Sequence, residues 1–321
     1  MLVRILKSWT SPDLLRQTPG GHGRWGDTTF TLEPIPNPDY LVVLNHIPQD
    51  TTVTISPTRI WLFVQEPPDS IYRWMEKGFP HFSRIHTQDK RLHGPSIHHT
   101  HGSLPWHVSR TYDQLIVETA PPRKTGDLSW ITSNLAITPG HRRRLAFLDR
   151  LRSAKVPFDL YGRGFNPIPD KYDGLAPYRY ALSIEKTVCE HYWSEKLADC
   201  FLSWTMPIYY GATKLEKYFP AESFIRIDIN DPSTPRRITE IIRSNHAEKH
   251  RDAIAEARRR VLEVHNLFPR LVRLISKDLL TPAASARTLT LPHNIDLTRY
   301  YIDHGPINRA LRSFRRRLLP V

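Results

Sequence analysis

The chain has 321 residues and a formal net charge of +13, and this length predicts two domains rather than one. The hydrophobic fraction of 40% excludes an intrinsically disordered chain. Only Cys189 and Cys200 are present, without a CxxC pair, which excludes a disulfide framework and a zinc ribbon. The positive charge predicts an anionic partner, such as nucleic acid, acidic lipid or a phosphorylated substrate.

The first 120 residues alternate short apolar runs with polar turns. Strands are predicted at Leu2–Leu6, Tyr40–Leu44, Ile60–Val64, Phe82–His86 and Gln114–Glu118, and a helix with Ser70 as its N-cap at Ser70–Gly78. This alternation is typical of a parallel sheet. The segment Pro95–His107 indicates a loop because His, Gly and Pro dominate it, and the spacing of its histidines matches no metal-ligand motif.

A second α/β series follows the proline-rich and charged segment Pro121–Gly126, which predicts a linker. Strands are expected at Leu128–Thr132, Phe158–Tyr161 and Tyr180–Ile184, and helices at Arg142–Ala154, from Ser194, at Arg236–Arg243 and at His246–Ser276. Pro269 should kink the last of these helices.

The two ends of the chain bear on location. The first residues, Met1–Asp13, hold an apolar run shorter than a signal peptide needs, and no stretch approaches the ~20 apolar residues of a membrane span. We therefore expect a cytoplasmic protein. Near the other end, Ile307–Leu319 places apolar and arginine side chains on opposite faces, which predicts a basic amphipathic helix in peripheral contact with the inner membrane face.

The segment Tyr180–Asp228 contains a set of motifs in a fixed order. They are Ile184-Glu185-Lys186, Tyr192-Trp193-Ser194-Glu195-Lys196-Leu197, Met206-Pro207-Ile208-Tyr209-Tyr210-Gly211 and Ser223-Phe224-Ile225. This order resembles the α-1,3-fucosyltransferases of glycosyltransferase family 10. In that family the first motif reads Phe-Glu-Asn, so Lys186 stands where an asparagine is usual.

The resemblance implies the GT-B fold, in which two Rossmann-like α/β domains face each other across a cleft and C-terminal helices follow. Residues 1–122 would form the N-terminal acceptor-side domain, and residues 123–280 the nucleotide-sugar donor-binding domain. Residues 281–321 would form a tail that contains the amphipathic helix.

The resemblance also implies which residues bind the donor. Lys196, near a helix start that favours anions, and Arg144 are expected to hold the diphosphate. Asn134 belongs to the matching Ser-Asn motif before that arginine. Tyr192 and Glu195 match residues that contact the ribose.

Two acidic residues complete the expected site. Glu66 follows the strand Ile60–Val64, and Phe63-Val64-Gln65-Glu66-Pro67 resembles a family strand that ends in the general base. Glu185 is expected to meet the sugar or to pair with Lys186, which in turn would add a phosphate contact or alter donor preference. The scheme requires no metal and no other cofactor.

The resemblance thus implies an inverting fucosyltransferase that moves L-fucose from GDP-β-L-fucose to a glycan hydroxyl, with an α-1,3-type linkage, in surface polysaccharide or lipopolysaccharide synthesis. A different nucleotide sugar remains an alternative because of Lys186, and so does a glycan-binding module without activity. From another class, the charge allows a basic nucleic-acid-binding protein. However, the aromatic residues do not interleave with basic ones, so no nucleic acid is expected as a partner.

Overall fold

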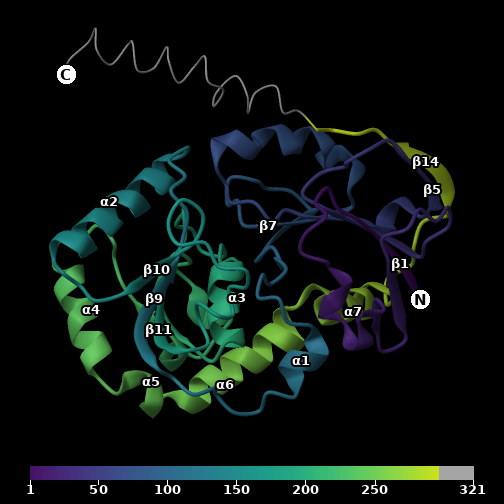
Figure 1. Cartoon of the computed structure of the whole chain (residues 1–321). Helices are drawn as coiled ribbons and strands as arrows, with labels where there is room; N and C mark the ends of the chain where they lie inside the picture. The colour runs from purple at the N-terminus through teal and green to yellow at the C-terminus, as the bar shows by residue number, and fades with distance from the viewer. Residues whose placement is uncertain (296–321) are drawn as a thin grey trace, which may run out of the picture.

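The computed structural model contains two separate parallel sheets with helices packed around them (Figure 1). It describes residues 1–295, so the helix expected at Ile307–Leu319 lies outside the described residues. The sheet orders are β2-β3-β1-β4-β6-β7-β8 and β10-β9-β11-β12-β13. All neighbours pair in parallel except β2 and β3. Two α/β domains in series are therefore confirmed.

The first sheet forms from the apolar runs of the N-terminal third of the chain. Its strands are β1 (Leu2–Leu6), β2 (Arg24–Trp25), β3 (Thr28–Thr31), β4 (Tyr40–Leu44), β6 (Ile60–Phe63), β7 (Arg84–Thr87) and β8 (Ile97–His99). The β4 and β6 side chains are buried on both faces of the sheet, as expected for central parallel strands.

Three predictions for this domain were wrong in part. The strand expected at Gln114–Glu118 is helix α1 (Tyr112–Ile116), because Thr111 and Gln114 form a capping box that starts a helix. The expected loop Pro95–His107 contains β8. The helix expected from Ser70 is a 3₁₀ helix, Ser70–His81, with Asp69 at the N-cap position.

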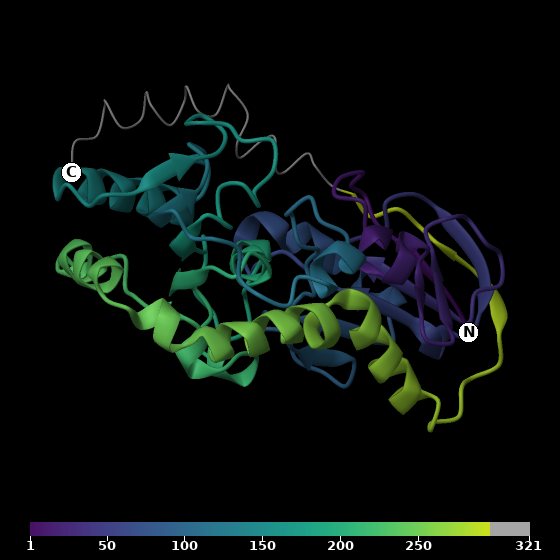
Figure 2. The same ribbon diagram turned by 60° about the horizontal axis from the view of Figure 1, so that its bottom comes forward.

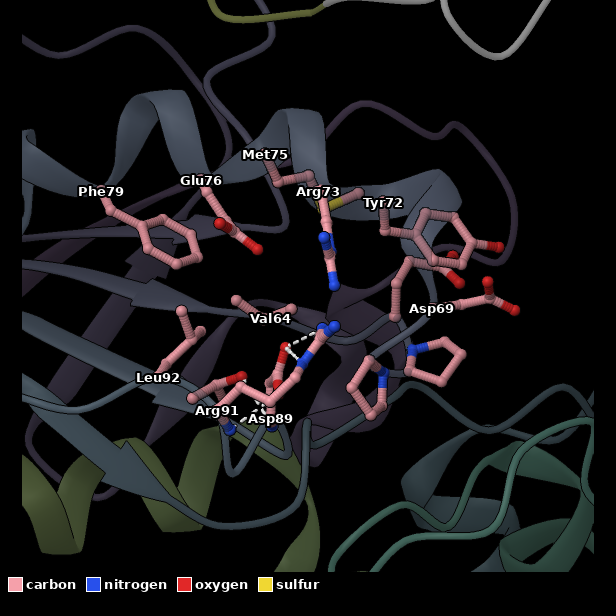
Figure 3. Close-up of a pocket in the computed structure, with 14 residues that line it drawn as sticks. Val64, Asp69, Tyr72, Arg73, Met75, Glu76, Phe79, Asp89, Arg91 and Leu92 are labelled. Atoms are coloured by element: carbon pink, nitrogen blue, oxygen red, sulfur yellow. Dashed lines mark hydrogen bonds and ion pairs between the residues drawn. The ribbon is translucent and has the colours of Figure 1, made fainter. Parts of the chain in front are cut away.

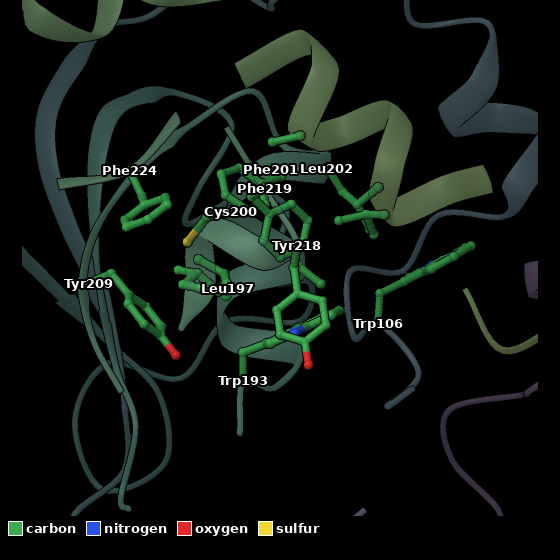
Figure 4. Close-up of a cluster of buried hydrophobic side chains, with 14 of the residues drawn as sticks. Trp106, Trp193, Leu197, Cys200, Phe201, Leu202, Tyr209, Tyr218, Phe219 and Phe224 are labelled. Atoms are coloured by element: carbon green, nitrogen blue, oxygen red, sulfur yellow. The ribbon is translucent and has the colours of Figure 1, made fainter. Parts of the chain in front are cut away.

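The second sheet has five strands, and the first three of them along the chain lie where the sequence places them, within a few residues. They are β9 (Gly126–Ile131), β10 (Asp159–Tyr161), β11 (Tyr178–Ile184), β12 (Met206–Tyr210) and β13 (Ile225–Arg226), with helices α2 (Pro139–Ser153), α3 (Glu195–Leu202) and α4 (Thr234–Arg243). Helix α3 buries Leu197, Cys200 and Phe201 in an aromatic-rich cluster with Trp193 and Phe219 (Figure 4). This packing holds α3 against β11 and β12 of the second sheet.

The C-terminal helices connect the second domain back to the first. The predicted helix His246–Ser276 is divided into α5 (His246–Lys249), α6 (Arg251–Arg260), a π-helical turn (Val261–His265) and α7 (Leu267–Asp278). The break lies at Asn266, the N-cap of α7. Pro269 occupies the first turn of α7, where its missing N–H costs no hydrogen bond.

Helix α7 packs on the first sheet and not on the second. Leu267, Phe268 and Leu271 contact the cluster that contains Val3 and Phe30, and Figure 2 shows the helices passing between the domains. Farther on, β14 (Arg287–Leu291) pairs with β5 (Thr51–Ile55). This packing differs from the expected boundaries 123–280 and 281–321, because long-range contacts return α7 and β14 to the first domain. It also differs from the expected range 1–122, because Trp106, Val108 and Leu115 pack in the cluster of the second domain.

Across residues 1–295, the helices are too short or too polar for any of them to traverse a lipid bilayer.

Candidate active site

A cleft of about 360 Å³ lies between the two domains. Its walls come from both: Trp9, Ser11, Pro12, Asn45, Gln65, Glu66, Leu104, Pro105 and His107 on one side, and Ser133, His141, Arg144, Lys186, Tyr192, Glu195 and Lys196 on the other. Several of these residues follow the carboxyl ends of parallel strands, where α/β sheets bind ligands. The volume is that of a small-molecule site. The cleft joins Glu66 to five of the seven expected donor-binding residues.

Glu185 lies beneath the cleft and does not line it. Its side chain is buried, and its Oε1 accepts hydrogen bonds from the Ser194 backbone N–H at 2.8 Å and from the Ser194 hydroxyl at 2.6 Å. Its Oε2 lies 3.4 Å from the Lys196 ammonium. Glu185 therefore fixes the start of α3 and the position of Lys196. Within residues 1–295 the expected pair of Glu185 with Lys186 is not formed, because Glu185 points into the interior and pairs with Lys196, while Lys186 pairs with Glu66. The expected contact of Glu185 with the sugar stays a prediction.

Lys196 belongs to a network of alternating charges. Its Nζ is 3.4 Å from Glu195 Oε1, which is itself 3.6 Å from the Nζ of Lys171. Burial acts to raise the pKa of Glu195, but Lys196 and Lys171 outweigh it and hold that pKa well below its usual range. Burial likewise opposes the charged form of Lys196, yet Glu185 and Glu195 prevail, so its pKa is raised. Lys196 is thus a permanent cation at the cleft wall.

Arg144 is the second cation of this wall. It is 5% exposed, its Nη2 donates to the Ser133 carbonyl at 3.1 Å and to the Ser133 hydroxyl at 3.2 Å, and its Nε has no partner within residues 1–295. Burial lowers the pKa of Arg144, and the Glu185 charge opposes this. A guanidinium without an acidic partner at close range in this part of the chain is suited to a bound anion.

His141 is a cleft residue that the sequence analysis missed. The Thr138 backbone N–H donates to its Nδ1 at 3.1 Å, in the capping box that starts α2. Burial, together with the charges of Arg144 and Lys186, lowers the pKa of His141 to about 4. The ring is therefore neutral near pH 7, with its proton on Nε2. The sequence feature that could have identified His141 is its position in the first turn of a helix that begins at Thr138-Pro139.

Glu66 stands on the opposite wall and is bridged to the second domain. Its side chain is 33% exposed, and its Oε2 lies 3.3 Å from the Lys186 ammonium. Lys186 also donates to the Tyr72 hydroxyl at 2.8 Å and lies 4.9 Å from the centre of that ring. Glu66 borders a second, smaller pocket of the first domain, which Tyr72 also lines and into which Arg73 projects (Figure 3). Lys186, the departure from the family motif, thus contacts the candidate base.

The remaining predicted residues divide between the cleft and the surface. Tyr192 lines the cleft and is buried, and the adjacent Trp193 stacks on His101 with ring centres 4.7 Å apart. Asn134 is exposed and is not among the lining residues; its side chain lies against Gly164. Over the part of the chain described, no group of three His, Cys, Asp or Glu side chains is arranged to hold a metal ion.

Comparison with known proteins connects the second domain to one family. Residues 121–251 match the model of glycosyltransferase family 10 (fucosyltransferase), C-terminal region. The chain is 32% identical over 133 residues to 4-galactosyl-N-acetylglucosaminide 3-alpha-L-fucosyltransferase 9 of Rattus norvegicus, covering 38% of this chain and 36% of that protein. It is 31% identical over 118 residues to alpha-(1,3)-fucosyltransferase FucT of Helicobacter pylori, covering 35% of this chain and 23% of that protein. The chain therefore spans about a third or less of these relatives.

The solved structures extend the likeness to the whole fold. A crystal structure of alpha1,3-fucosyltransferase superposes with a TM-score of 0.50 at 16% identity, covering 88% of this chain and 90% of that structure. The expected GT-B fold is thereby confirmed. The motifs at Tyr192–Leu197 and Met206–Gly211 lie inside residues 121–251, the part of the chain that is similar to glycosyltransferase family 10.

Proposed function

We propose that the chain is an inverting glycosyltransferase that moves L-fucose from GDP-β-L-fucose to a glycan hydroxyl, with an α-1,3-type linkage. One observation supports this most: a single cleft places the Glu66 carboxylate opposite the cations Arg144 and Lys196. Sugar transfer from a nucleotide requires a base and positive charge for the leaving group. The relatives' names, both of 1,3-fucosyltransferases, support the transferred sugar and the linkage.

In this mechanism each wall of the cleft has its own task. Arg144 and Lys196 neutralise the diphosphate as the bond between sugar and phosphate breaks, and Tyr192 and Glu195 hold the ribose. Glu66 takes the proton of the acceptor hydroxyl, whose oxygen attacks the anomeric carbon from the face opposite the diphosphate. Attack from that face inverts the configuration. His141 lines the same wall of the cleft as the two cations and offers a neutral N–H there.

Glu66→Gln tests the base directly. The variant should bind GDP like the wild type in calorimetry, because Glu66 does not contact the diphosphate, and should lose transfer by a factor of ~10² or more. Glu76→Gln, at an acid that borders the smaller pocket, is the matched control and should retain transfer. A Glu66→Gln protein with wild-type turnover would remove Glu66 from the mechanism.

The donor and the setting are tested separately. Among GDP, UDP, CMP and dTDP, GDP should give the largest thermal shift. A different nucleotide sugar is the alternative that Lys186 supports, and a larger shift with UDP would favour it.

We propose that no divalent metal is needed, so transfer should persist in EDTA. We also propose that the enzyme is cytoplasmic, lies peripherally on the inner membrane face and acts in surface polysaccharide or lipopolysaccharide synthesis. A variant truncated before Ile307 should then bind anionic vesicles more weakly than the full chain does.

A further inference from the structure

A third cavity, of about 370 Å³, lies in the first domain and is distinct from the smaller pocket beside Glu66. Its walls follow three neighbouring strands that run in parallel, β3, β1 and β4. The lining residues are Arg4, Ile5, Leu6, Lys7 and Ser8 from β1 and its end, Leu32 and Pro34 after β3, Pro48 and Gln49 after β4, and Ile295. The carboxyl ends of parallel strands are where open α/β sheets bind ligands. The cavity is as large as the cleft between the domains and none of the roles above uses it.

Arg4 gives this cavity its chemistry. The residue is 5% exposed, and its Nε has no partner within residues 1–295. Its Nη1 donates to the Ile35 carbonyl at 3.2 Å. Within residues 1–295, burial lowers the pKa of Arg4 without any acidic side chain to oppose it, and none of the ten residues that line the cavity in this range is Asp or Glu. A buried cation without a counter-charge is unfavourable unless a ligand supplies one.

The rest of the lining adds a second cation and apolar walls. Lys7 donates through Nζ to the Trp9 carbonyl and lies 5.6 Å from the centre of that ring. Ser8 borders this cavity whereas Trp9, the next residue, borders the catalytic cleft. Pro34 and Pro48 offer apolar surface on which the carbon faces of a ring can pack. The two cavities therefore adjoin along the chain.

We propose that this cavity binds an anionic group of the glycan acceptor, a phosphate or a carboxylate, with Arg4 as the specificity-determining residue. The inference rests on the proposed transfer function. In the sheet, β6, which leads to Glu66, lies next to β4 and β4 next to β1. At a strand spacing of ~4.8 Å, β1 and β6 are about 10 Å apart. An extended acceptor can therefore place its anion at Arg4 and its reacting hydroxyl at Glu66.

Binding of a small organic anion tests the site without turnover. With GDP in excess to fill the donor cleft, calorimetry should detect phenyl phosphate or benzoate on the full chain, and the stronger of the two identifies phosphate or carboxylate as the group. Arg4→Met, which keeps the side-chain volume, should weaken binding at least tenfold. Ser8→Glu places a negative charge at the exposed rim, so it should weaken binding comparably even if Arg4→Met fails to fold. Ser276→Glu, on the exposed side of α7, is the matched control. Equal affinity for wild type and Ser8→Glu would overturn the inference.

Acceptor preference tests the link to transfer. We would measure kcat/KM of the wild-type protein for three acceptors: a neutral disaccharide, its 1-phosphate and its uronic acid form. One anionic acceptor should be preferred at least tenfold, and Arg4→Met or Ser8→Glu should bring that ratio close to one. Equal use of all three acceptors by the wild type would overturn the inference and leave the transfer function intact. No transfer to any acceptor, with phenyl phosphate binding retained, would count against the transfer function and not against the anion site.

Discussion

Replacing Lys196 should cost stability as well as donor binding. The side chain of Glu185 is 0% exposed, and Lys196, 26% exposed, is its cationic partner at 3.4 Å. Lys196→Met leaves this carboxylate buried without its cation, a change that costs about 3 to 5 kcal/mol for a fully buried pair. Because Lys196 is partly solvated and Glu185 keeps the Ser194 hydrogen bonds, we expect a loss of about 2 to 3 kcal/mol in the free energy of unfolding.

A double-mutant cycle separates the two effects. Urea unfolding of Lys196→Met, Glu185→Gln and the double variant measures the pair. The double variant should be within about 1 kcal/mol of Glu185→Gln, because residue 185 no longer carries a charge and Glu195 keeps Lys171 as its cation at 3.6 Å. Its affinity for GDP should still be lower than that of Glu185→Gln by about 2 kcal/mol, the usual contribution of a hydrogen bond to a charged group.

Two results would refute this reasoning. Unfolding of Lys196→Met at the wild-type urea concentration would mean that Glu185 does not depend on the ammonium. Unchanged GDP affinity in the double variant, relative to Glu185→Gln, would remove Lys196 from the diphosphate site.

Three further substitutions address the other charged groups. Arg144→Met should weaken GDP binding by about 2 kcal/mol in calorimetry, and equal affinity would place the diphosphate elsewhere. Lys186→Asn restores the family residue; since its pair with Glu66 is partly exposed, the free energy of unfolding should fall by less than about 1 kcal/mol. The same variant should change the ranking of nucleotide sugars in thermal shift, and an unchanged ranking would exclude Lys186 from donor selection. Burial, opposed by a hydrogen bond to the Tyr218 carbonyl, lowers the pKa of His265 from 6.5 to about 4. The unfolded chain therefore binds the proton first, and stability is lost as pH falls from about 6.5 to about 4. His265→Phe should reduce that loss by about 2 to 3 kcal/mol, measured by urea unfolding at pH 7 and 4.5; equal losses would contradict the assignment.

The sequence predicted the features that depend on local pattern. Strands such as Tyr40–Leu44 are apolar at every position, and Ser194 is a favourable N-cap, so both lie where expected. Glu66, Arg144 and Lys196 line one cleft because each comes from a loop or helix that follows the carboxyl end of a parallel strand. These strands are β6, β9 and β11.

Other features depend on directions and distant contacts that the pattern does not contain. Glu185 and Lys186 are adjacent, and successive side chains at the end of a strand point to opposite sides. The sequence does not tell which of them faces the cleft, and the structure buries Glu185. In the same way, the apolar stripe of α7 predicts that the helix packs on a sheet but not on which one. Its packing against Val3 and Phe30 depends on contacts between residues far apart in the sequence. The helix α1 was missed because the capping pair Thr111 and Gln114 outweighs the strand preference of its apolar residues.

The return of α7 to the first domain means that the polypeptide crosses between domains twice, before α1 and again before α7. Arg270 ties these crossings together: its Nη1 donates to the His101 carbonyl at 2.7 Å and its Nη2 to the Thr100 hydroxyl at 2.9 Å. Two crossings fastened side by side form a single hinge line. A rotation of the domains about that line would keep the buried Arg270 contacts, whereas sliding would break them.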